Sequence, residues 1–139
     1  MISRILVGYD GSDSSNDALE LAADLASHYV AELHVLAVAR PPEFGDEVET
    51  RAVTEQSQHH LNKVLSQARS RLVTNKAKQH FHVLVGHPAE QIVRYAEEHA
   101  IDHIVVGRRG HTVFERWLIG SVARQVVAYA RCAVTVVRK

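Results

Sequence analysis

Residues 104–110 read IVVGRRG, and after nine further residues the chain continues with GSV at positions 120–122. Consecutive β-branched apolar residues are typical of a strand that is buried on both faces, as in a parallel sheet. Gly107 ends this run, and Gly120-Ser121 precedes a helical stripe made by Val122, Val126 and Ala130. The stretch therefore predicts a strand, a loop bounded by glycines and a helix, which is one unit of an α/β fold.

Short apolar runs and amphipathic stretches alternate in the same way along the whole chain. The runs predict strands at residues 2–8, 33–38, 81–85, 104–106 and 134–137. Apolar residues at helical spacing predict a first helical face with Ala18, Leu21, Ala22, Leu25 and Tyr29, and a second with Leu61, Val64, Leu65, Ala68 and Leu72. The fold class is therefore α/β, with crossover helices on a parallel sheet.

Several residues are typical of helix starts and loops. Ser12 or Asp13 is expected to cap the first helix, and Pro88 is expected in the first turn of the third. The fourth helix is expected to begin near Ser121. Residues 40–49 have no periodic pattern and are predicted to form a loop.

Length, composition and charge limit the classes of protein to which the chain can belong. The chain has 139 residues, 46% of them hydrophobic, which suits one domain spanning residues 1–139. Sixteen basic residues balance sixteen acidic ones, so no general positive field for nucleic acid is expected. A single cysteine and the lack of a signal peptide or membrane span predict a cytoplasmic protein.

The glycines beside the last two predicted units favour phosphate binding. Gly107, Gly110 and Gly120 let the backbone approach a ligand closely, and Ser121 stands at a helix start, where free amides favour anions. The simpler interpretation is a glycine turn followed by an ordinary serine cap. The set of glycines after a strand favours the phosphate interpretation, because ligands of open sheets bind beyond the carboxyl ends of the strands.

Asp10 is expected at the same edge of the sheet, directly after the first strand. Its carboxylate could bind ribose hydroxyls or help to hold Mg²⁺ on phosphates. It could equally form an Asx turn with Ser12 that starts the first helix. The two roles are compatible with each other.

Residues 104–111 together with 120–122 resemble the nucleotide motif of the universal stress protein family, GxxG, nine residues and G(S/T). Residues 4–12 resemble the opening strand of that family, and residues 33–35 resemble its second strand, so the similarity covers nearly the whole chain. The resemblance implies an adenine nucleotide alpha hydrolase-like fold, a single open five-stranded parallel sheet of order 3-2-1-4-5 with helices on both faces. It also implies a homodimer that forms through the segment from Val134 to Val137.

The resemblance further implies that ATP, with Mg²⁺, binds between the first and fourth strands. Asp10 would meet the ribose and the Val35 backbone the adenine. The phosphates would lie against the segments that match the motif, which include Gly107, Arg108, Gly110, Gly120, Ser121 and Val122.

Two positions depart from the pattern of the family. Arg124 stands where relatives often have a glutamate that completes a capping box, and we hypothesise that this cation neutralises phosphate charge. Arg131-Cys132-Ala133 stands where relatives often carry prolines. This second departure concerns the dimer strand and not the nucleotide.

Several other residues that could suggest a functional site are expected to have structural roles or to lie in solvent. His80 and His82 share a strand face and His59 and His60 are adjacent on a helix, a spacing that does not predict a metal site, so solvated histidines are expected. Cys132 is expected to be an inert core thiol, and Phe114 and Trp117 to serve packing. The Walker loop and the dinucleotide GxGxxG pattern are absent from the sequence.

The resemblance implies an ATP-binding protein that acts as a nucleotide-dependent sensor or regulator of the stress response. A slow ATPase is the first alternative, although only Asp10 and, more distantly, His111 could act as a base. The second alternative is a dimer that binds no nucleotide and acts through protein contacts. The intact glycine set argues against that alternative.

Overall fold

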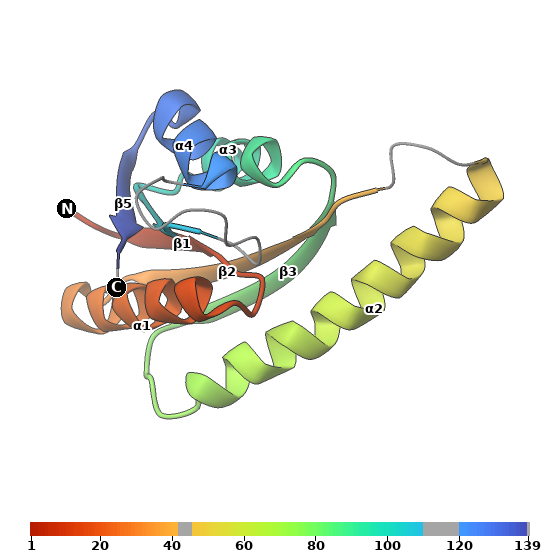
Figure 1. Ribbon diagram of the computed structural model, residues 1–139. Helices are drawn as coiled ribbons and strands as arrows, with labels where there is room; N and C mark the ends of the chain where they lie inside the picture. The colour runs from red at the N-terminus through yellow and green to blue at the C-terminus, as the bar shows by residue number, and fades with distance from the viewer. Residues whose placement is uncertain (42–45, 110–119, 139) are drawn as a thin grey trace.

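The structure is a computed structural model that describes residues 1–41, 46–109 and 120–138. At its centre lies a five-stranded sheet of order β3-β2-β1-β4-β5, in which every neighbouring pair is parallel (Figure 1). This order confirms the predicted topology. The strands are β1 (Arg4–Gly8), β2 (Glu32–Ala39), β3 (Gln79–Val85), β4 (His103–Gly107) and β5 (Ala133–Val137).

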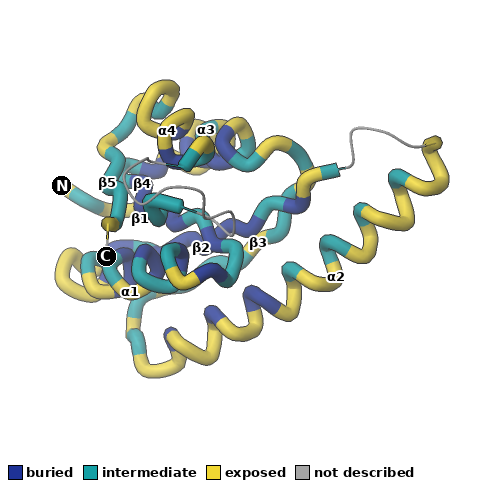
Figure 2. The backbone as a smooth tube through the Cα atoms, viewed as in Figure 1, coloured by how far each residue is buried: buried dark blue, intermediate teal, exposed yellow. Residues whose placement is uncertain are grey.

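Helices cover both faces of the sheet, as expected for parallel strands joined by crossovers. One apolar core joins the helices α1 and α2 to the sheet, and a second joins α3 and α4 to the opposite face (Figures 1 and 2). The helices are α1 (Asp13–Tyr29), α2 (Glu47–Arg71), α3 (Pro88–Glu98) and α4 (Ser121–Tyr129). Among the described residues, no helix has the length and apolarity to cross a bilayer.

Helix α1 begins where the sequence predicts, but the buried face is rotated. The Ser12 side chain accepts a hydrogen bond from the Ser15 N–H, so Ser12 is the N-cap. The sheet buries a stripe of mainly small residues, whereas Leu21 and Leu25 are half-buried and Tyr29 is exposed. Alanines let the helix approach the strands closely, which leaves the larger side chains at the margin of the contact. The buried apolar residues are Ala18, Leu19, Ala22, Ala23 and Ala26.

Helix α2 is longer than predicted, because it starts inside the segment that was expected to be a loop. Asp46 caps it by accepting a hydrogen bond from the Glu49 N–H at 2.8 Å. Its amino-terminal half extends beyond the sheet and is mostly exposed (Figure 2). That half has no apolar stripe to reveal it in the sequence, since its helical conformation comes from capping and propensity and not from burial.

Helix α3 and the final strand agree with the prediction. Pro88 occupies the first turn of α3, with Ile92 and Ala96 buried against the sheet. Cys132 lies directly before β5 and packs against the second core, and burial raises the pKa of its thiol. An uncharged thiol is a weak nucleophile, so the inert role expected for Cys132 agrees with its surroundings.

Gly107, at the end of β4, is required by packing as well as by any ligand. A Cβ at this position would stand 2.6 Å from the Ser14 carbonyl oxygen and 2.7 Å from its carbonyl carbon. Both atoms belong to the backbone of α1, which cannot move without shifting the helix. The glycine therefore sets how closely α1 lies against the end of β4.

We expect Gly107→Ala to lower the free energy of unfolding by about 1–3 kcal/mol, because the added methyl group forces α1 and β4 apart. Urea denaturation measures this change. Gly8→Ala is the matched control, since its Cβ would meet side chains and no backbone atom: the flexible end of Ile92 at 3.0 Å and Val106 at an ordinary contact distance of 3.6 Å. Equal losses of stability in the two variants would contradict this explanation.

Candidate functional site

A cleft of about 360 Å³ lies at the carboxyl ends of the central strands. This volume is within the range of small-molecule sites, which is about 300–1,000 Å³. Its apolar wall comes from β2, α3 and β4, and its polar wall from the loop after β1 and the start of α4. The lining residues are Gly8, Tyr9, Asp10, Ser15, Leu36, Val38, Arg40, Pro88, Ile92, Val106, Gly107, Arg108, Arg109, Gly120, Ser121, Val122 and Ala123.

The loop after β1 is held in a fixed turn. The Asp10 carboxylate accepts a hydrogen bond from the Ser12 N–H at 2.9 Å, which is the Asx turn predicted from the sequence. Gly11 has a φ of +83°, a conformation that favours glycine. Asp10 also lines the cleft, so the turn places its carboxylate at the site.

Backbone hydrogen bonds fix the two ends of the segment that joins β4 to α4. The Gly120 N–H donates to the Arg108 carbonyl oxygen at 2.7 Å, and the Arg108 N–H donates to the Val137 carbonyl oxygen at 2.9 Å. The Arg109 N–H donates to the Ser14 hydroxyl at 3.2 Å. These bonds bring the end of β4 and the start of α4 together, although eleven residues separate Arg108 from Gly120 in the sequence.

Helix α4 starts at the cleft without a capping side chain. Its N-cap is Gly120, which has no side chain to bond the first amides, and its first turn contains no acidic residue. The N–H groups of Ser121, Val122 and Ala123 have no partner within the helix, and all three residues line the cleft. Free amides and the positive end of the helix dipole make this wall suited to an anion.

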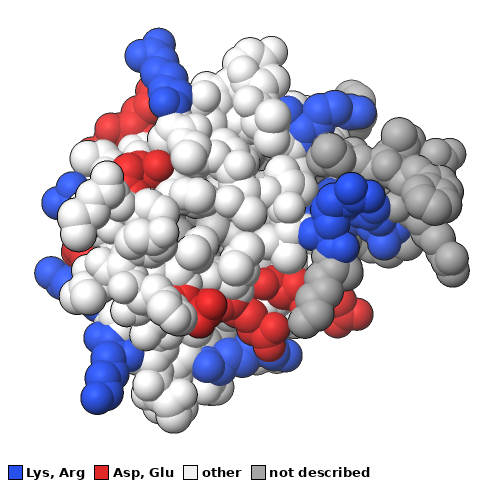
Figure 3. All heavy atoms as spheres, turned by 90° about the vertical axis from the view of Figure 1, so that its left-hand side faces the viewer, with Lys and Arg blue, Asp and Glu red and all other residues white. Residues whose placement is uncertain are grey.

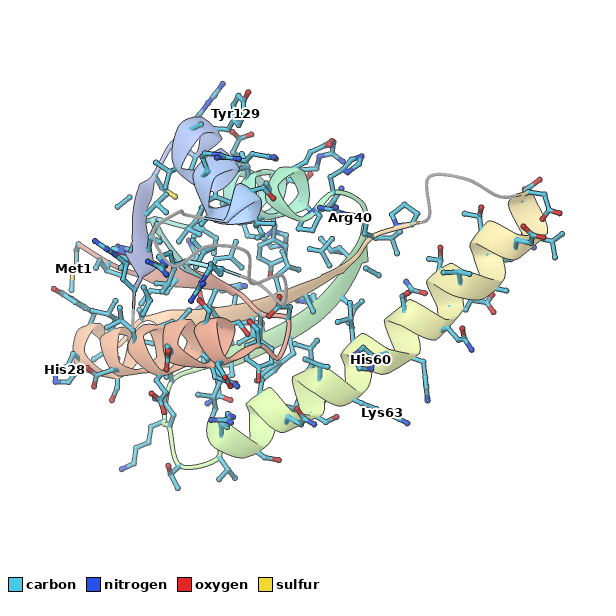
Figure 4. All side chains as sticks on the ribbon, viewed as in Figure 1. Met1, His28, Arg40, His60, Lys63 and Tyr129 are labelled. Atoms are coloured by element: carbon cyan, nitrogen blue, oxygen red, sulfur yellow. The ribbon has the colours of Figure 1, made fainter. Side chains whose placement is uncertain are left out.

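Three arginines add positive charge to the lining of the cleft. Arg40 reaches the cleft from the end of β2 (Figure 4), and Arg108 and Arg109 follow β4. Arg124 is exposed on α4 and is not among the lining residues, so the structure does not place it where the sequence hypothesis requires. Arg40 was missed from the sequence because it lies in a stretch without periodicity.

The cleft gathers most of the residues that the sequence and the resemblance indicate. Asp10, Gly107, Arg108, Gly120, Ser121 and Val122 all line it. Gly110 lies outside the described residues, as do His111, Phe114 and Trp117.

Val35 is not brought to the cleft. It is fully buried in the core under α1 and α2, whereas Leu36 and Val38 of the same strand line the cleft. Side chains alternate along a strand and the site lies at its carboxyl end, so Val38 has both the right face and the right depth. The alternation of side chains along β2 could therefore have indicated from the sequence that Val38 faces the cleft.

Comparison with known proteins agrees with this geometry. The profile of the Universal stress protein family matches residues 1–138. The chain belongs to the universal stress protein family. It is 36% identical over 146 residues to universal stress protein MJ0531 of Methanocaldococcus jannaschii, covering 100% of this chain and 84% of that protein. It is 31% identical over 153 residues to YxiE of Bacillus subtilis, covering 99% and 100%.

Solved structures of universal stress proteins share the fold. UspA from Lactobacillus plantarum superimposes with a TM-score of 0.90 at 28% identity, covering 98% of this chain and 97% of that one. A universal stress protein in complex with cAMP has a TM-score of 0.76 at 26% identity, covering 98% and 96%. One from Archaeoglobus fulgidus in complex with dAMP has a TM-score of 0.67 at 25% identity, covering 98% and 98%. Some structural neighbours therefore bind adenine nucleotides.

Proposed function

We propose that this universal stress protein binds ATP, together with Mg²⁺, in the cleft and acts as a nucleotide-dependent sensor or regulator of the stress response. The observation that carries the proposal is the uncapped start of α4, which faces a cleft that also holds three arginines. Phosphates carry the negative charge and the acceptor oxygens that would pair with the free amides of α4 and with the arginines. The cAMP and dAMP complexes of structural neighbours support an adenine nucleotide.

The two walls of the cleft suit the two ends of this ligand. Leu36, Val38 and Ile92 offer apolar surface for a purine, and the amides of α4 offer donors for phosphates. Asp10 lies between them and suits a ribose hydroxyl or a phosphate-bound Mg²⁺. In the proposed arrangement Val38, and not Val35, borders the base.

A sensor fits this cleft better than a fast ATPase. Among the described residues that line the cleft, Asp10 is the one carboxylate, and it already accepts a hydrogen bond from the Ser12 N–H. Rapid phosphoryl transfer needs a group that orients or deprotonates the attacking water. We therefore propose that nucleotide occupancy, and not turnover, carries the signal.

We also propose that the protein forms a homodimer through β5. In the described chain β5 pairs only with β4, so its other edge is open to a second copy. Figure 3 shows the side of the molecule where β5 lies, and charged side chains there lie mostly around a largely uncharged centre. Sedimentation equilibrium that finds only monomers at micromolar concentration would contradict the dimer.

Ser121→Pro tests the amides of α4 directly. Proline is well tolerated in the first turn of a helix, and Gly120 already has an extended ψ of 159°, as a residue before proline requires. The variant should keep its fold but lose one amide donor, so we expect ATP affinity to fall roughly tenfold or more. Isothermal titration calorimetry measures the affinity.

Ser121→Ala is the matched control, since it removes the hydroxyl and keeps the amide. We expect its affinity to fall about threefold or less, because a neutral hydroxyl contributes less than an amide at the helix start. If the alanine and proline variants bind ATP equally well, the phosphates do not contact the amide of Ser121.

Arg40→Ala should weaken ATP binding roughly threefold to tenfold at low salt and reduce its dependence on salt, since a cation is removed from the phosphate wall. The control is Arg124→Ala, which removes an exposed arginine that does not line the cleft. Calorimetry at two salt concentrations compares the variants. If Arg124→Ala weakens ATP binding more than Arg40→Ala does, then Arg124 and not Arg40 neutralises the phosphate charge.

Incubation of the pure protein with ATP and Mg²⁺ separates the functional alternatives. A sensor should retain nearly one ATP per chain after gel filtration and release negligible phosphate over the same period. Repeated turnovers would identify an ATPase. Loss of all nucleotide during filtration, with no heat of binding in calorimetry, would favour the protein that acts through contacts alone.

A further inference from the structure

A second polar cluster lies at the amino-terminal end of the sheet, away from the nucleotide cleft. Glu32 and His34 are two residues apart on β2, so their side chains lie on the same face of the strand. The register pairs His34 with His80 of β3. Three potential metal ligands therefore meet on the face that α3 covers.

The ligand atoms of these residues are close together. One ligand atom from each of Glu32, His34 and His80 lies within 4.8 Å of the other two. The His80 Nε2 is 3.1 Å from the Glu32 Oε1, and the rings of His34 and His80 stack with centroids 4.4 Å apart. In a tetrahedral zinc site, ligand atoms stand about 3.4 Å apart, given metal–ligand bonds of about 2.1 Å. The two rings stack at an interplanar angle of 18°, so their in-plane lone pairs do not converge as they stand, and the more exposed His80 ring must turn out of the stack to close the set around an ion.

His34 provides the independent observation that points to a ligand. It is only 6% exposed, and its Nε2 is buried without a hydrogen-bond partner in the structure. Leaving a buried polar atom unpaired is energetically unfavourable, so such atoms are rare without a functional reason. A bound metal ion would satisfy this nitrogen.

The other ring nitrogen of His34 is already oriented as in known metal sites. The His34 Nδ1 lies 2.7 Å from the Tyr95 hydroxyl oxygen of α3. If Nδ1 donates its proton there, Nε2 carries the lone pair, and an outer hydrogen bond of this kind is what fixes a metal-binding histidine.

We propose that Glu32, His34 and His80 bind a divalent transition-metal ion, with Zn²⁺ as the best fit. Two imidazoles and one carboxylate suit a borderline ion such as Zn²⁺ better than Mg²⁺ or Ca²⁺, which prefer oxygen ligands. Three protein ligands leave a fourth position for water. The site is distinct from the nucleotide cleft, because it lies at the opposite end of the strands.

Access and charge are compatible with this proposal. The side chains of His80 and Glu32 are 31% and 27% exposed, so an ion can enter from solvent and these ligands can adjust. Arg4 and Lys78 now pair with Glu32 at 3.0 and 3.8 Å, and both cations are largely exposed. They can turn toward solvent when the ion binds, because exposed ion pairs contribute little stability.

The experiment is a titration of the tag-free, nucleotide-free protein with Zn²⁺ by calorimetry, repeated with Co²⁺ to record its visible absorption. We expect one ion per chain and a tetrahedral Co²⁺ spectrum. His80→Ala should weaken Zn²⁺ binding at least about a hundredfold and abolish the spectrum, since it removes one of the three ligands. Tyr95→Phe should weaken binding about tenfold, because the tyrosine positions His34 and does not bind the ion.

The matched control is the double variant His59→Ala with His60→Ala, which removes two exposed histidines of α2, where Figure 4 labels His60. This variant should bind Zn²⁺ as the unmodified protein does. The proposal is overturned if the protein binds no Zn²⁺, if one ion requires two chains, or if His80→Ala binds as tightly as the control. Unchanged ATP affinity in His80→Ala would show that the metal site and the nucleotide cleft are independent of each other, so that one proposal can fail without the other.

Thermal unfolding with and without Zn²⁺ distinguishes ligand loss from misfolding. An ion that binds only the folded protein raises its melting temperature. The unmodified protein should show this rise and His80→Ala should not, while both melt alike without metal. An equal rise in the two proteins would overturn the proposal, because the ion would then be bound elsewhere.

Discussion

Parallel pairing of β1 with both β2 and β4 is the constraint on which both ends of this molecule depend. It aligns Leu6 with His34 on one side and with Ile104 on the other, so the carboxyl ends of the central strands reach the same edge of the sheet. The loops that follow β1 and β4 must then face each other. A cleft therefore forms between these two loops because the strands before them run in the same direction.

Close packing of α1 on β4 fixes the position of one side of that cleft. Gly107 allows the backbone of α1 to pass beside the end of the strand, and the Ser14 hydroxyl there accepts a hydrogen bond from the Arg109 N–H. One glycine therefore serves the fold and the site together. The phosphate interpretation of Gly107 and its packing role are complementary, since the close approach of α1 is what positions the residues that line the polar wall.

Polar groups at the two ends of the sheet differ in their access to solvent. At the carboxyl end, helix amides and arginines face an open cleft, where water or an anion can satisfy them. At the amino-terminal end, the unpaired Nε2 of His34 is enclosed by the protein and water has little access to it. The energetic demand for a partner is therefore greater at the histidine cluster than in the open cleft.

Local patterns in the sequence determined the strands, the helix caps and the glycine-bounded loop, because these depend on residues near one another in the chain. They predicted the sheet elements, the Ser12 cap and the Pro88 start and, together with the resemblance, six of the seventeen residues that line the cleft. The full length of α2 was missed because its exposed amino-terminal half has no apolar stripe. Tertiary structure alone decided the rotation of α1, because the sheet determines which face of the helix is buried. It also brought His34 to His80 across 46 positions of sequence, since strand register, and not spacing along the chain, determines which side chains meet.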